Sequence, residues 1–254
     1  MQIISDNQHA LRVIQISDSH VAGSRETQYR GEDARQTLSA VVSAAREWQP
    51  DILLATGDLS EDASPESYAA LADMLTPMGI PLLTLPGNHD DAAEQSKWFS
   101  CCPVGAPIRV CAGGWDLILL DSTVPGEVPG QFADCELEAL QGLLDEAPER
   151  PKLVALHHHP VLTGSHWIDR FPLLEPGRFW QVLDQCDAVR MVTWGHVHHA
   201  SESLRGSVSL LAAPSTVANS LPRVDRFTRD PSGPACRWLV LEPGGQFETG
   251  LMRP

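Results

Sequence analysis

The chain has 254 residues and a formal net charge of -15, with 18 lysines and arginines against 33 aspartates and glutamates. Hydrophobic residues make up 43% and charged residues 20%, which is ordinary for a globular protein and excludes a largely disordered chain. The acidity argues against a nucleic acid or an anionic membrane as the main partner. An anionic substrate would need local cations that reverse this field at its site.

The cysteines and the first residues indicate the compartment. None of the six cysteines forms a C-x-x-C pair, so they are predicted to be reduced thiols. Residues 1–10 are polar and lack the basic and apolar regions of a signal peptide. No apolar run approaches the roughly 18 residues of a membrane span. We expect a cytoplasmic protein that does not cross a membrane.

The first half of the chain alternates apolar strands with amphipathic helices. A buried strand is a continuous apolar run, whereas apolar residues at a spacing of three and four indicate a helix. Proline and glycine mark the ends. In chain order, the pattern predicts a strand over 11–17, a helix over 38–48, a strand over 53–56, a helix that begins at 64–66 and stops at 77–79, and a strand over 80–85.

The second half is less regular. Proline and glycine interrupt 101–114, and 219–234 has no periodicity and is predicted to be a mobile loop. No repeat or linker appears, so we expect a single domain over 1–254, with a core over about 11–213 and C-terminal strands and a loop over 214–254. The predicted elements are strands at 108–110, 115–121, 153–156, 189–194, 207–212, 237–241 and 246–251, and helices at 134–146 and 179–185.

Metal-ligand residue types follow five of the predicted strands. Asp58 is typical: it comes directly after a buried strand, through Gly57, at the edge where α/β sheets bind ligands. Eight of the ten histidines lie in these strand-end segments, a clustering that scattered histidines would not give. The segments carry Asp18 and His20; Asp58; Asn88 and His89; His157, His158 and His159; and His196 and His198, with His199 next to them.

The residue types predict the class of metal. Carboxylate, amide and imidazole donors without a thiolate suit Zn²⁺, Mn²⁺ or iron. Seven ligands are too many for one tetrahedral ion and fit two ions that share a bridge. Asp58, with donors on both sides, is the expected bridging carboxylate.

In order and in spacing, these blocks resemble the signature of the calcineurin-like metallophosphoesterases, and the resemblance covers Leu11 to about Ala213. Within that superfamily the chain is most similar to the bacterial class III cyclic-AMP phosphodiesterases, through residues 11–20, the histidine run before Pro160, and the segments 167–169 and 214–216. The signature blocks are Asp18-x-His20, Gly57-Asp58, Gly87-Asn88-His89-Asp90, His158-His159-Pro160 and Gly195-His196-x-His198.

The resemblance implies an α/β fold, a four-layer αββα sandwich of two mostly mixed β-sheets flanked by helices, with the metal site at the C-terminal ends of strands. It implies that one ion is held by Asp18, His20, Asp58 and His198. The other ion would be held by Asp58, Asn88, His158 and His196. The histidine run leaves an alternative open, because His157 or His159 is one register step away and points to the opposite side from His158.

The resemblance also implies catalytic roles for Asn88, His89 and Asp90. Two ions about 3.5–4 Å apart would hold a water and lower its pKa to about neutral, so that the bridging hydroxide attacks phosphorus. Asn88 would help to neutralise the phosphoryl oxygens. His89 would face the phosphate and protonate the leaving oxygen, with Asp90 as its orienting partner.

The implied activity is hydrolysis of 3',5'-cyclic AMP, or a related cyclic nucleotide, to the 5'-monophosphate. The alternatives are another phosphodiester (a glycerophosphodiester or a pyrophosphate), a phosphomonoester, or an inactive scaffold for protein contacts. The expected partner is a small-molecule substrate, and similar proteins include homodimers. In the loop after His159, His166 and Trp167 are open to two interpretations: base stacking or a lid at the site, and plain solvent exposure. Asp121 is interpreted as structural.

Overall fold

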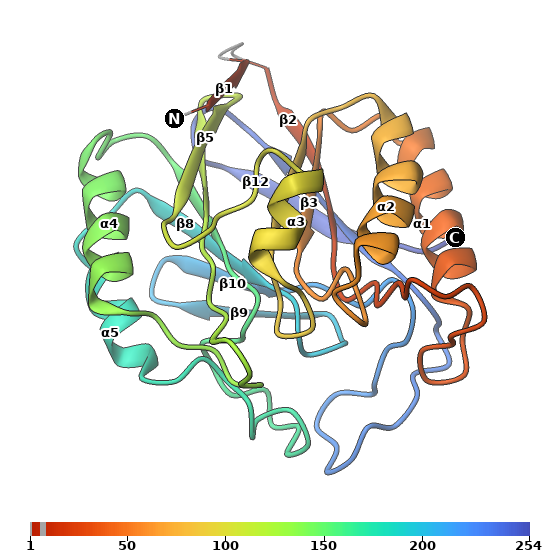
Figure 1. Ribbon diagram of the computed structural model, residues 1–254. Coiled ribbons are helices and arrows are strands. Elements are labelled where there is room, and N and C mark those ends of the chain that lie inside the picture. Colours follow the sequence, from red (N-terminus) through yellow and green to blue (C-terminus); the bar gives the residue numbers. More distant parts are fainter. Residues whose placement is uncertain (1, 6–8) are drawn as a thin grey trace.

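The computed structural model describes residues 2–5 and 9–254. Two β-sheets lie face to face, and helices cover both outer faces (Figure 1). This order of layers, helix–sheet–sheet–helix, confirms the predicted αββα sandwich of two mixed sheets.

One sheet has five strands, of which the first three along the chain are parallel. The C-terminal strands complete it, because β11 pairs antiparallel with both β2 and β12. The C-terminal segment is therefore part of the sandwich. In spatial order the strands are β12 (Phe247–Met252), β11 (Cys236–Leu241), β2 (Leu11–Ile16), β3 (Ile52–Thr56) and β4 (Leu82–Leu85).

The other sheet has seven strands, with a parallel centre from β6 to β10 and an antiparallel pair towards each side. In spatial order the strands are β1 (Gln2–Ser5), β5 (Ile108–Ala112), β6 (Trp115–Leu119), β7 (Lys152–Ala155), β8 (Val189–Trp194), β10 (Val208–Ala212) and β9 (Ser201–Arg205).

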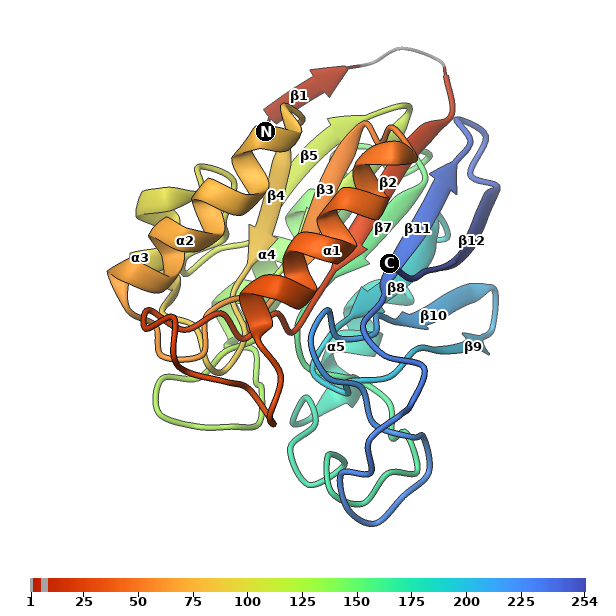
Figure 2. The same ribbon diagram turned by 90° about the vertical axis from the view of Figure 1, so that its right-hand side faces the viewer.

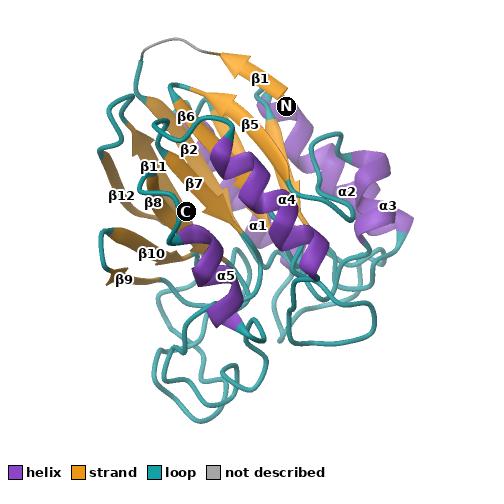
Figure 3. Ribbon diagram, turned by 90° about the vertical axis from the view of Figure 1, so that its left-hand side faces the viewer, coloured by secondary structure: helices purple, strands orange, loops and turns teal. Residues whose placement is uncertain are grey.

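The helices begin where the sequence supplies a cap. Ser64, before Pro65, accepts a hydrogen bond from the Ser67 backbone at the start of α2, as expected for a serine N-cap followed by proline. Figure 2 shows α1 and α2 across the five-stranded sheet, and Figure 3 shows α4 and α5 across the seven-stranded sheet. The helices are α1 (Ala34–Glu47), α2 (Pro65–Leu75), the 3-10 helix η1 (Thr76–Met78), α3 (Ala92–Trp98), α4 (Asp134–Asp145) and α5 (Pro176–Leu183).

The apolar core has three parts that follow the layers. One cluster fills the space between the sheets, for example Leu54 of β3 with Leu117 of β6. The other two lie between a sheet and its helices: Leu38 of α1 packs with Leu53, and Leu140 of α4 packs in one cluster with Val154. Strands buried on both faces explain why these segments read as continuous apolar runs.

Three named elements were not predicted from the sequence, namely α3, β9 and β1. Helix α3 has seven residues and buries only Gln95, so it carries no apolar stripe, although Asp91 caps it. Strand β9 is mostly exposed and has no apolar alternation. The segment 219–234 contains no named helix or strand within the described residues, as expected, and its mobility stays a prediction.

Among the described residues, no helix combines the length and the apolar character that crossing a membrane requires. The carboxyl ends of β2, β3 and β4 in one sheet and of β7 and β8 in the other open onto long loops gathered on one side of the sandwich (Figure 1). That side carries all five predicted ligand segments.

Candidate metal centre

Both sheets contribute to the cluster of polar side chains at this edge. Asp18 and His20 follow β2, Asp58 follows β3, and Asn88 and His89 follow β4. The seven-stranded sheet adds the histidines after β7 and β8. Parallel strands end at the same edge, so residues far apart in the sequence meet here.

Five of the seven predicted ligands have a left-handed backbone. Side chains other than glycine rarely adopt this conformation, and it persists where the surrounding structure holds it, often at functional sites. It turns the chain sharply just after the strand that precedes each of these residues. The residues and their φ angles are Asp18 (52°), His20 (46°), Asp58 (48°), His196 (67°) and His198 (51°).

Asp18, His20 and His198 form one half of the cluster. Nε2 of His20 lies 3.2 Å from Nε2 of His198, and that nitrogen lies 3.4 Å from Oδ1 of Asp18. All three side chains are buried. Together they form a group of ligand atoms close enough to hold one ion.

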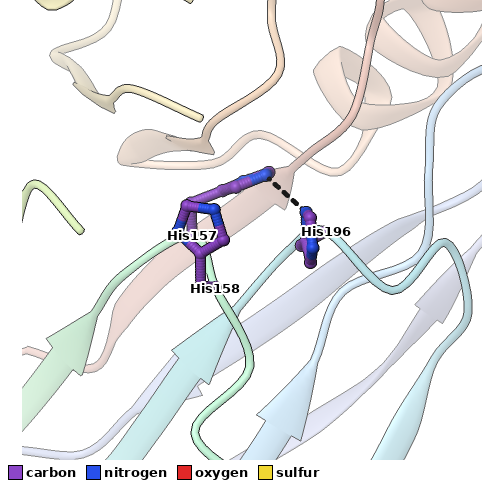
Figure 4. Close-up of side chains that lie close together, drawn as sticks. All are labelled: His157, His158 and His196. Carbon is purple, nitrogen blue, oxygen red and sulfur yellow. Dashed lines mark hydrogen bonds between the residues drawn. The ribbon is translucent and has the colours of Figure 1, made fainter. Parts of the chain in front are cut away.

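His157 and His196 form the other half, next to Asp58. Nε2 of His157 lies 3.4 Å from Oδ1 of Asp58 and 3.2 Å from Nδ1 of His196, a contact drawn in Figure 4. The other Asp58 oxygen, Oδ2, lies 3.8 Å from Nε2 of His20. Asp58 therefore faces both halves, where a bridging carboxylate would have to be.

Four histidines have one ring nitrogen fixed from outside the cluster and the other directed into it. The outer acceptors are carbonyl or carboxylate oxygens, which cannot donate, so each outer nitrogen carries the proton. The inner nitrogen is then left with its lone pair, as a metal ligand requires. The outer contacts are His20 Nδ1 to Glu61 Oε2 (2.7 Å), His157 Nδ1 to Thr56 O (2.8 Å), His196 Nε2 to Phe171 O (2.9 Å) and His198 Nδ1 to Ala218 O (2.8 Å).

His158 differs from these four because neighbours occupy both of its nitrogens. Nε2 donates to the carbonyl of Val128 over 3.0 Å, and Nδ1 lies 2.8 Å from the hydroxyl of Ser122, which must donate to it. His158 lies near His157 and His196, as Figure 4 shows, but no lone pair is free. His159 points elsewhere, with Nε2 3.4 Å from Oδ1 of Asp169.

The residues fit a pair of cations. Two nitrogens bound to one tetrahedral zinc lie about 3.4 Å apart, close to the 3.2 Å between the inner nitrogens of each pair. The Asn88 side-chain oxygen is buried, and none of the described residues bonds to it, as expected of an acceptor meant for an ion. Burial lowers the pKa of His157, yet the Asp58 charge raises it to about 9. The cluster therefore attracts positive charge.

His89 lies at the edge of this cluster and pairs with Glu61. Its Nδ1 lies 3.3 Å from Oε2 of Glu61, and its backbone N–H donates to Oδ1 of Asp58 over 2.9 Å. Burial lowers the pKa of His89, but the Glu61 hydrogen bond and the Asp58 charge raise it to about 9. The ring can therefore hold a proton at neutral pH.

The prediction that Asp90 orients the His89 ring is wrong in the structure. The Asp90 carboxylate accepts hydrogen bonds from the backbone of Leu59, Ser60 and Gly87, and from the Tyr68 hydroxyl. These bonds tie the loop after β3 to the loop after β4. Asp90 thus fixes the position of two ligand loops, and the acid beside the His89 ring is Glu61.

A cavity of about 670 Å³ opens beside the cluster. Its lining includes Asn88 and His89 of the cluster and Val124 and Gly126 of the loop after β6. Cavities of this size commonly hold small-molecule ligands. Asp121, interpreted from the sequence as structural, lines the wall and accepts hydrogen bonds from Thr123.

Sequence reasoning missed several contributors. Glu61 was visible as the acid three residues after Asp58, and its distance from His20 in the chain hid their contact. Tyr29 also gave no signal, yet its ring stacks on His20 with centroids 3.8 Å apart. The carbonyl acceptors carry no side-chain signature at all. Trp167 lies beside the centre, 6.3 Å from the His198 ring, whereas the His166 side chain is 80% exposed.

Comparisons with known proteins agree with this geometry. The sequence model of the family described as calcineurin-like phosphoesterase matches residues 11–200. The chain is 37% identical over 243 residues to the 3',5'-cyclic adenosine monophosphate phosphodiesterase CpdA of Pseudomonas aeruginosa, covering 95% of this chain and 89% of that protein. It is 33% identical over 246 residues to CpdA of Escherichia coli strain K12, covering 96% and 90%.

A solved structure shares the fold at low identity. A dimetal phosphatase from Danio rerio superposes with a TM-score of 0.67 at 13% identity and covers 96% of this chain and 99% of that chain. The family implies two metal ions, in agreement with the histidine and aspartate cluster. The match over 11–200 and the identity with its relatives over almost the whole chain lead to one conclusion: this protein is a member of the calcineurin-like phosphoesterase family.

Proposed function

We propose that the protein hydrolyses 3',5'-cyclic AMP, or a closely related cyclic nucleotide, to the 5'-monophosphate. The observation that carries the proposal is the buried cluster, in which inner histidine nitrogens and two carboxylates converge beside a cavity of about 670 Å³. Relatives named as cyclic nucleotide phosphodiesterases, in Pseudomonas, Escherichia and Nostoc, support the substrate class.

We propose that Asp18, His20, Asp58 and His198 hold one ion, and that Asp58, Asn88, His157 and His196 hold the other. His157 replaces His158 here because His157 has a free nitrogen 3.4 Å from Asp58 and His158 has none. The mixed nitrogen and oxygen donors suit iron, manganese or zinc. When bound, two such ions polarise the phosphoryl group and supply a nucleophile at neutral pH.

The side chains around the ions would orient the substrate and move one proton. Asn88 lies at the junction of cluster and cavity, where its amide can donate to a phosphoryl oxygen while its oxygen binds an ion. His89 lines the same cavity, and because Glu61 and Asp58 raise its pKa to about 9, the ring can hold a proton to donate to the leaving 3' oxygen. General acid catalysis of this kind contributes roughly 10²–10⁴ in rate.

The cavity wall would receive the nucleoside. Asp91, Asp121 and Glu136 lie in its lining and offer acceptor oxygens. Ribose hydroxyls and an exocyclic amine are donors that would match them. This chemistry favours a nucleotide over a phosphomonoester without a sugar.

We propose that the chain forms one domain, because each sheet supplies only part of the ligand set. The net charge of -15 disfavours a nucleic acid as the main partner and so supports a small-molecule substrate.

The test is a substrate panel on protein loaded separately with Mn²⁺, Fe²⁺ or Zn²⁺. The expected result is conversion of cyclic AMP to 5'-AMP with a higher kcat/KM than for bis(p-nitrophenyl) phosphate, and little activity on p-nitrophenyl phosphate. Asp58→Ala should abolish conversion and metal binding together. If the protein hydrolyses the generic diester but not cyclic AMP, its substrate is another diester. If it hydrolyses nothing with two ions bound, the proposal that it is an enzyme is rejected.

A further inference from the structure

Arg30 is a cation without an acidic partner among the described residues. Its Nε donates to the Tyr29 hydroxyl over 3.3 Å, and its other contacts are with aromatic rings. The guanidinium carbon lies 3.8 Å from the centroid of Phe227, 5.4 Å from that of Tyr29 and 5.9 Å from that of Trp167. What distinguishes Arg30 is that three aromatic rings surround its exposed guanidinium in a chain with a net charge of -15.

The three rings connect Arg30 to the metal centre, and we call Tyr29, Trp167 and Phe227 the aromatic layer. Tyr29 stacks flat on His20, with centroids 3.8 Å apart and planes 5° apart. Trp167 and Phe227 each lie 6.3 Å from the His198 ring. The aromatic layer therefore lies against Arg30 and also against the rings of His20 and His198.

The backbone that carries Arg30 is strained and is held in place from a second loop. Tyr29 and Glu32 exchange two backbone hydrogen bonds, which makes Arg30 and Gly31 the central residues of a tight turn, with φ of 50° and 84°. Asparagine or glycine is the usual residue at the first of these positions. Arg229 binds the Arg30 carbonyl over 2.5 Å and also pairs with the Glu32 carboxylate.

A guanidinium stacked on aromatic faces keeps its N–H edge free for an anion. Strained backbone that is braced in this way is typical of functional sites. We propose that Arg30 binds the phosphoryl group of the substrate as it approaches the His20–His198 side of the centre, and so reverses the repulsion from the acidic chain. The inference rests on the proposed function only in requiring an anionic phosphoester.

Arg30→Gln is the main test, on protein with both ions bound. The KM for bis(p-nitrophenyl) phosphate should rise about tenfold with kcat within about twofold, as expected for a lost hydrogen bond to a charged group. The KM of the variant should also depend less on NaCl concentration, because one charge contact is missing. Arg30→Lys should restore part of the affinity, since a point charge remains without the planar fork.

Arg25→Gln is the matched control. Arg25 lies exposed on the same loop and is not part of the aromatic layer, and its replacement changes the net charge equally. Its KM should stay within about twofold of the unaltered protein. An equal rise of the KM in both variants would mean that only the net charge of the protein matters, and it would overturn the inference.

Binding of inorganic phosphate, measured by calorimetry, gives a second readout that needs no turnover. Phosphate should bind about tenfold more weakly to Arg30→Gln than to the unaltered protein or to Arg25→Gln. Unchanged phosphate binding together with unchanged KM would overturn the inference. If the unaltered protein cleaves the generic diester and leaves cyclic AMP intact, the proposed function fails, while these two readouts still decide the role of Arg30.

Discussion

Oε2 of Glu61 lies 2.7 Å from Nδ1 of His20 and 3.3 Å from Nδ1 of His89. One carboxylate oxygen thus contacts a proposed metal ligand and the proposed general acid, which come from two different loops. Burial raises the pKa of Glu61, but hydrogen bonds from the two histidines lower it to about 2. Glu61 is therefore ionised at any pH at which the enzyme would act.

Glu61→Gln should weaken metal binding on the His20 side. The amide can still accept from His20, but it no longer makes the ring more basic or favours the tautomer with a free Nε2. Loss of such an outer partner typically costs 10–100-fold in metal affinity or activity, and about that loss is expected here. Titration of the protein with Mn²⁺ or Zn²⁺ under a competing chelator measures it. Glu47→Gln, an exposed position at the end of α1, should leave the affinity unchanged, and an equal loss there would contradict the role.

His89→Ala should keep both ions and lose roughly 10²–10⁴ in kcat, because the proton for the leaving oxygen is missing. Metal analysis and steady-state kinetics on the same sample separate the two effects. Full kcat in this variant would remove His89 from the mechanism.

The pH dependence gives a further test of His89 and Glu61. A general acid works only while it is protonated, so kcat should fall as pH rises through the His89 pKa. That pKa is about 9 in the structure, and bound cations repel the imidazolium, so the falling limb should lie below pH 9. Because removing the Glu61 charge lowers the pKa of His89 further, Glu61→Gln should shift the falling limb of the kcat profile towards lower pH. A limb that stays fixed in this variant would mean that another group titrates.

The strands and the ligand segments could be predicted because they depend on short-range patterns. Buried strands such as β3 are continuous apolar runs, and an aspartate or a histidine after each one marks the edge where ligands bind. Helix α3 and strand β9 could not be predicted, because neither presents an apolar face of its own.

The direction in which each side chain of the ligand segments points could not be predicted from the sequence. Alternation predicts that His157 and His158 point to opposite sides, but it could not say which of the two faces Asp58, since that depends on where β7 ends and how the chain turns. The contact of Glu61 with His20 spans 41 residues, and the role of Asp90 depends on two loops that meet only in the folded protein. Such contacts are properties of the packing of loops on the sandwich.

His157 and His158 can be separated by metal content. His157→Ala should leave the His20–His198 ion and lose most of the other, because a free nitrogen next to Asp58 is removed. His158→Ala should retain two ions, since both nitrogens of that ring already have partners in Ser122 and Val128. Elemental analysis of the two purified variants makes the comparison directly. Loss of an ion from His158→Ala alone would restore the ligand set implied by the resemblance.

Gly57→Ala should disturb the metal centre around the bridging carboxylate Asp58 more than it disturbs the rest of the fold. Gly57 has a φ of 88°, and a Cβ there would lie 2.4 Å from Nδ1 of His157 and 2.8 Å from the Gly87 nitrogen. Gly79 has a φ of 70° and open space around it, so Gly79→Ala carries the backbone strain alone, about 1–2 kcal/mol. The alanine at 57 adds a clash that pushes His157 from Asp58. Urea unfolding should show a greater loss of stability for Gly57→Ala, and metal analysis should show fewer than two ions only in that variant. Equal losses in both, with two ions retained, would mean that the close approach of Gly57 to His157 does not position the centre.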